Sequence, residues 1–215
     1  MGVLSRLFGD PQKAKAEEII RNVERRHRPV SHLAQSILVG SFSCGEKMQP
    51  HLIAPTRAAT DALYPAVCYE FIFFFAHMLN RYALSILGAD GRMKLQDEIG
   101  PLIVVPAISG FFDHWPEDRK AKLVDDFYGD MSAAELDYSS CRELVPSSVQ
   151  VLFREILDDS DSPAKCLVSK LISRIFNLSG KSLSPEAVTF LFDVSTKALL
   201  EMKLEQHVRE IKEVL

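Results

Sequence analysis

Three ionisable residues interrupt the most apolar stretch of the chain, which spans residues 62–87. On a helix, Glu70, His77 and Arg81 fall within about 40° of one another, because each residue turns the side-chain direction by about 100°. A charge that is buried among apolar side chains needs a partner. The stripe therefore predicts either a polar seam between packed helices or one wall of a ligand site. Tyr69 and Asn80 flank it and can supply hydrogen bonds to either arrangement.

A single metal ion does not fit this stripe. Glu70 and His77 are seven residues apart, which is about 10.5 Å along a helix axis and too far for both to bind one ion. Two adjacent metals, or ligands from other helices, would be needed. The Glu-x-x-His pair of Glu24 and His27 lies among basic residues and has no second copy. We therefore predict no metal and no cofactor, and the catalytic residues, if any, are not identified.

A second candidate is His114, which stands beside Asp113 and between aromatic residues at the junction of two expected helices. Aromatic side chains beside a polar pair can form a ligand pocket. Such a cluster more often closes the end of a hydrophobic core.

Motifs for other chemistry are missing from the sequence. It contains no GxSxG, HExxH, phosphate-binding GxxxxGK[ST] or dinucleotide-binding GxGxxG pattern. The net charge of −4 supplies no basic face for nucleic acid, so no nucleic-acid partner is expected. The four cysteines lack metal-type spacing, and no signal peptide is recognisable, which favours reduced thiols and a cytoplasmic location.

A membrane span is the alternative reading of the apolar stretch. Eighteen apolar residues approach the length of a spanning helix. Glu70 in the middle would cost about 2.5 to 3.5 kcal/mol on insertion, and His77 and Pro65 add to the difficulty. We therefore expect a buried core helix and no membrane span.

The fold class expected is all-α, because no stretch alternates apolar and polar residues with the period of a strand. We expect one helical domain over residues 1–215, a bundle of about eight helices around the long apolar central helix. Residues 1–30 would form a peripheral N-terminal helix, and residues 203–215 a protruding helix end.

Prolines and glycines set the expected boundaries. Asp10-Pro11 opens a helix that ends before Pro29, a short helix covers 31–39, and residues 41–55 form a loop. The central helix stops at the turn-rich residues 88–91, and further helices cover 93–99, 101–112, 117–128, 132–140 and 146–158. Ser162-Pro163 and Ser184-Pro185 cap the last two helices, the second running to Leu215.

The end of the last helix carries a short apolar seam, formed by Leu204, Val208, Ile211 and Leu215 at spacings of four, three and four. Such a seam can bind a helical partner or a second copy of the chain, or it can dock on its own domain. We therefore expect a soluble helical interaction or regulatory module without catalytic activity. The alternative is a small-molecule-binding or metal-binding helical protein that uses the stripe, with an enzyme as one form of it.

Overall fold

The computed structural model describes residues 11–52, 57–140, 163–179 and 185–213, and within these ranges the only regular elements are helices. The expected all-α class is thereby confirmed. The elements follow one another as α1 (Pro11–Met48), a 3-10 turn η2 (Gln49–His51), α2 (Arg57–Phe112), α3 (Glu117–Ser139), α5 (Pro163–Ser179), α6 (Pro185–Met202) and α7 (Leu204–Lys212). These are fewer helices than the eight or so expected, because several expected breaks are absent. The helix expected over 146–158 lies outside the described residues.

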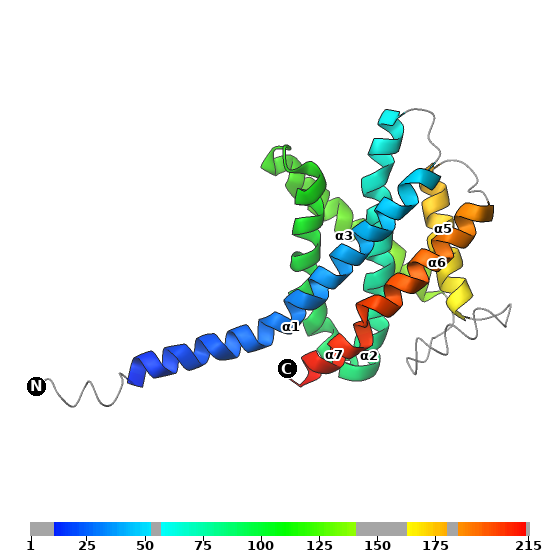
Figure 1. Cartoon of the computed structure of the whole chain (residues 1–215). Coiled ribbons are helices and arrows are strands. Elements are labelled where there is room, and N and C mark those ends of the chain that lie inside the picture. The colour runs from blue at the N-terminus through cyan, green and yellow to red at the C-terminus, as the bar shows by residue number, and fades with distance from the viewer. Residues whose placement is uncertain (1–10, 53–56, 141–162, 180–184, 214–215) are drawn as a thin grey trace, which may run out of the picture.

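The expected break before Pro29 is wrong, because α1 continues through this residue to Met48. Proline removes one helical hydrogen bond. The following residues nevertheless bury one face of the helix at spacings of three and four, formed by Val30, Leu33, Ala34, Ile37, Ser41, Cys44 and Met48. Packing of this face outweighs the helix-breaking effect of Pro29. It also makes residues 41–48, the first part of the expected loop, helical. The N-terminal part of α1 extends away from the rest of the molecule (Figure 1).

The expected break of the central helix is confirmed at Gly88, which has φ 76° and ψ −177° inside α2. The chain runs down the first segment of α2 (57–87), turns, and runs back along the second segment (89–112), as Figure 1 shows in cyan and green. The expected new start at Gly100-Pro101 is wrong, since the second segment continues through Pro101 and Pro106. α3 likewise runs unbroken through Gly129.

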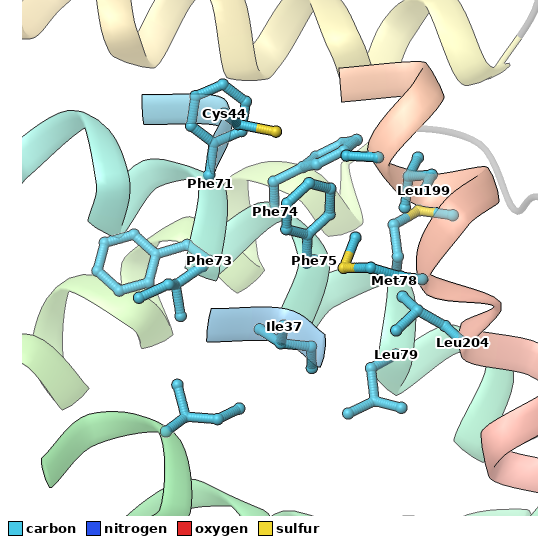
Figure 2. Packing of buried hydrophobic residues seen from close by; sticks show 14 of the residues in the cluster. Ile37, Cys44, Phe71, Phe73, Phe74, Phe75, Met78, Leu79, Leu199 and Leu204 are labelled. Carbon is cyan, nitrogen blue, oxygen red and sulfur yellow. The ribbon is translucent and has the colours of Figure 1, made fainter. Parts of the chain in front are cut away.

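The core is built around the first segment of α2. Phe71, Phe73, Phe74 and Phe75 are all buried, and Figure 2 shows them beside Ile37 of α1 and residues of the C-terminal helices. α2 contacts α1, α3, α5 and α7, while α1 also contacts α6 and α7. The most apolar element is therefore covered from several sides by the chain itself.

The C-terminal third begins its two helices where the sequence indicates, at Pro163 and Pro185. The last helix is not continuous, however, because Lys203 adopts a left-handed conformation and separates α6 from α7. This bend turns Leu204, Val208 and Ile211 into the core, where all three are buried. The helix end therefore lies against α1 and α2 and does not protrude as expected. Leu215 lies outside the described residues.

The stretch Leu63–Phe112 is long and apolar enough to cross a membrane by length and composition, and 56% of its most apolar window is buried inside the molecule. Core helices of soluble proteins pass the same test. The stretch does not clearly indicate a membrane protein.

Candidate functional site

The stripe residues lie where α2, α3 and α5 meet. Glu70 and His77 on α2 are buried, with exposed fractions of 6% and 2%, and Arg81 and Asn80 are half-buried. Each of these side chains contacts a polar side chain, and most of the contacts come from α3 and α5. Together with those partners they form a polar seam between helices, which we define as Glu70, His77, Asn80, Arg81, Gln96, Glu135, Asp137, Lys170 and Arg174.

One half of the polar seam is an ion-pair chain that starts at Glu70. Arg174 of α5 donates from Nε to Oε2 of Glu70 at 2.5 Å and from Nη2 to Oε1 at 3.1 Å. The other edge of this guanidinium faces Asp137 of α3, with Nη1 3.7 Å from Oδ2. Lys170 closes the chain by donating to Oδ1 of Asp137 at 2.9 Å. Carboxylates and cations therefore alternate from the core toward the surface.

Burial governs the ionisation of this half. Removal from water raises the pKa of Glu70 above its ordinary value, and the hydrogen bonds and charge of Arg174 oppose this only in part. Burial alone would lower the pKa of Arg174, but Glu70 outweighs it and the pKa is raised. The pKa of Asp137 is lowered, chiefly by the hydrogen bond from Lys170.

The other half of the polar seam is centred on His77. Its Nδ1 lies 2.8 Å from Oε2 of Glu135 on α3, and Nε of Arg81 lies 2.7 Å from its Nε2. A guanidinium can only donate, so Nε2 accepts and the proton sits on Nδ1, where it bonds to the carboxylate. His77 is therefore held between the carboxylate of Glu135 and the guanidinium of Arg81.

Asn80 and Gln96 complete this half at its outer end. Asn80 donates to Glu135 at 3.4 Å and accepts from Gln96 at 2.8 Å, which ties the first segment of α2 to the second. Burial alone would raise the pKa of Glu135. The hydrogen bond and the charge effect of His77, followed by the hydrogen bond from Asn80 and the charge of Arg92, outweigh burial and hold this pKa below its ordinary value.

This arrangement leaves little for catalysis. A general base needs a free lone pair that faces a substrate, yet both nitrogens of His77 are engaged within the chain, and both oxygens of Glu70 accept from Arg174. The residues that the structure describes contain no group of three or more His, Cys, Asp or Glu side chains that could hold a metal ion. The side chains of Glu24 and His27 lie outside the described part of the chain.

Tyr69 and His114 are not brought into the polar seam. The ring of Tyr69 packs edge-on against Phe111 and Phe127, and its hydroxyl is buried without a hydrogen-bond partner among the described residues. His114 is exposed in the turn between α2 and α3, with its ring 6.4 Å from that of Trp115. Trp115 stacks on Phe112 and carries Arg119 over its face. These aromatic side chains therefore pack against one another at the turn between α2 and α3.

An open pocket lies elsewhere, between α1 and α6, which run side by side in Figure 1. We call it the α1–α6 groove. Its volume is about 560 Å³. Its apolar surface comes from Val39, Gly40, Cys44, Val194, Ala198 and Met202, and its ionisable residues are His32, Lys47, Lys197, Glu201 and, from α7, His207.

The two helices that form the groove are antiparallel. His51 stacks on Phe190, Cys44 faces the carbonyl of Val194, and Gly40 lies against Met202, so rising numbers on α1 match falling numbers on α6. Lys47 therefore lies at one end of the groove, and His32 and His207 lie toward the other.

The thiol in the groove is not a nucleophile. Burial raises the pKa of Cys44 to about 12, and that of the neighbouring Cys68 also to about 12, so both stay protonated at neutral pH. They are free cysteines.

The sequence analysis missed the groove because it predicts a loop for residues 41–55. A signal was present: eight lining residues of α1 follow one another at spacings of three and one, which marks one helix face, namely 32, 35, 36, 39, 40, 43, 44 and 47. Arg174, Glu135 and Asp137 were missed because nothing local connects them to the stripe.

Comparison of the chain with protein-family models, with curated proteins and with solved structures gives no match.

Proposed function

We propose that this protein is a helical binding module without catalytic activity, and that it takes its ligand in the α1–α6 groove. The observation that carries this proposal is the contrast between the polar seam and the α1–α6 groove. The polar seam is closed, because its acids and bases engage one another within the chain. The groove is open and has more apolar than polar surface, and its thiol is protonated.

Small-molecule sites are typically concave, mostly apolar and about 300–1,000 Å³ in volume, with a few polar groups that orient the ligand. The groove has these properties. Binding at the stripe, the alternative inferred from sequence, would require a ligand to displace an internal ion pair or hydrogen bond of Glu70 or His77.

A partner helix or a second copy of the chain at the C-terminal seam is supported less. Leu204, Val208 and Ile211 are buried against the same chain, so a partner could reach them only if α7 left its place. A cytoplasmic location remains part of the proposal, supported by the two buried free thiols and the covered apolar segment.

A neutral polarity-sensitive dye tests the proposal. We expect the full chain to bind Nile red saturably, and we expect Val39→Glu to abolish this binding, since Val39 lines the groove and is 61% exposed. The control is Val105→Glu on α2, at a valine that is 54% exposed and lies outside the groove. If the dye does not bind saturably, or if both variants bind it as the wild type does, the groove is not a ligand site.

A further inference from the structure

The groove presents its charge in a simple pattern. Lys197 and Glu201 lie on the same face of α6 with Nζ 4.0 Å from Oε1, so they largely cancel. Lys47, on α1, makes no ion pair or side-chain hydrogen bond with the described residues, and its charge acts on Cys44, as the charge of Glu201 does in the opposite sense. One uncompensated cation therefore stands at one end of an apolar surface.

The far end of the groove is polar and is lined by His32 and His207. His32 is exposed there, and Nδ1 of His207 is buried without a hydrogen bond, 3.5 Å from a carboxylate oxygen of Glu210. Between His32 and Lys47 the face of α1 extends over about 22 Å at 1.5 Å per residue. The apolar side chains Val39, Cys44, Ala198 and Met202 lie between these ends.

The size of the groove distinguishes a small ligand from a docked helix. A helix with its side chains is about 10–12 Å across and needs a broad apolar strip on its partner. Among the described lining residues, Val39 is the only large apolar side chain that is well exposed. A volume of about 560 Å³ suits a narrow ligand that lies along the helices.

We propose that the α1–α6 groove binds an elongated apolar molecule with a single carboxylate, whose carboxylate pairs with Lys47 and whose chain lies along Val39, Cys44 and Met202. This inference rests on the proposed function and specifies its ligand class. A monoanion matches the single uncompensated ammonium, which offers point-charge attraction without the two-pronged geometry of an arginine. The thioether of Met202 is flexible enough to adapt to chains of different shape.

Displacement of Nile red from the full chain by decanoate and by decanol tests the inference, since the two ligands share an apolar chain and differ in charge. We expect decanoate to displace the dye at lower concentration than decanol. We expect Lys47→Gln to weaken decanoate about fivefold, as loss of one partly exposed ion pair would, and to leave decanol unchanged. Lys122→Gln, the same change on α3 away from the groove, is the matched control.

A second pair of variants tests the charge of the ligand without removing Lys47, by calorimetric titration with decanoate and no dye. Charge attraction predicts that Val39→Lys binds decanoate about tenfold or more tightly than Val39→Glu does. Thermal melts of each variant check that it is folded.

The outcomes separate the two proposals. If Nile red binds at the groove but decanol displaces it as well as decanoate does, or if Lys47→Gln has no effect, the carboxylate inference is wrong and the binding module stands. If an amphipathic peptide displaces the dye and decanoate does not, the inferred ligand class is wrong, and the proposal of a binding module stands. If Nile red does not bind saturably, the proposed function itself fails.

Discussion

Arg174 and Glu70 lie 104 residues apart in the chain and are joined by two hydrogen bonds, one from Nε and one from Nη2 of the guanidinium. Glu70 is buried in the most apolar helix, and Arg174 reaches it from α5. This pair neutralises a carboxylate in the core and fixes the position of α5 against α2.

Removing one partner should be strongly destabilising, because the other charge stays buried. We expect Glu70→Leu and Arg174→Met each to lower the free energy of unfolding by about 3–5 kcal/mol, and the double variant to recover a large part of that loss. Chemical denaturation of the four proteins measures the coupling. Arg209→Met is the control, since Arg209 makes a similar two-bond pair with Glu205 on the surface and should lose less than about 1 kcal/mol. Strictly additive losses at Glu70 and Arg174 would contradict the pairing.

The acid dependence of stability should follow Glu135. Its pKa is lower in the folded protein than its ordinary value of 4.5. A carboxylate of this kind adds stability that is complete above the unfolded value and that is lost as the pH falls through the folded value. We therefore expect the Tm of the wild type to fall on acidification below pH 4.5 more steeply than that of Glu135→Gln, which cannot titrate. The pKa of Asp137 is also lowered, so Asp137 contributes equally to the pH dependence of the Tm in both proteins. Parallel curves for the two proteins would show that Glu135 is not held as described.

Gly88 should be intolerant of a side chain although there is room for one. A Cβ at this position would meet no atom within 4 Å, but φ 76° with ψ −177° is a conformation almost restricted to glycine. We expect Gly88→Ala to lower the free energy of unfolding by about 1–3 kcal/mol.

Gly129 provides the matched control for this prediction. A Cβ there would also meet no atom within 4 Å, and the residue lies inside the continuous helix α3. Gly129→Ala should therefore raise the stability by about 0.5–1 kcal/mol. Equal effects at the two glycines would mean that the turn does not require the backbone conformation described.

The C-terminal seam should behave as part of the core. Ile211 is fully buried, so Ile211→Ala is expected to lower the free energy of unfolding by about 2–5 kcal/mol. Because the contact is internal, the Tm of both proteins should not depend on protein concentration. A wild-type Tm that rises with concentration, and loses this dependence in Ile211→Ala, would instead support self-association through α7.

Local signals predicted the fold where a helix end is set by its own residues. The structure confirms the boundaries expected at Gly88, Pro163 and Pro185, and the start of the helix expected at residue 117. The same kind of signal was misleading at Pro29 and at Gly100-Pro101, where burial of the neighbouring apolar face outweighs the weakening of a single turn.

The candidate site shows a similar division. Periodicity placed Glu70, His77 and Arg81 on one face, and the need to pair buried charge predicted partners on other helices. The identity of those partners depends on how α3 and α5 are oriented in space, which no local pattern of Arg174 or Glu135 records. Whether His77 was bound by an acid or left open to a ligand could therefore be learned only from the assembled helices.

The position of Arg174 late in the chain also orders events during synthesis. A nascent chain that has been made only as far as α3 already contains Glu70, set among phenylalanines, but not the guanidinium that neutralises it. Until α5 leaves the ribosome, this carboxylate must take up a proton or keep its part of the helix in contact with water. The apolar helix can therefore bury itself completely only after α5 has been made, which makes final closure of the core wait for the synthesis of that helix.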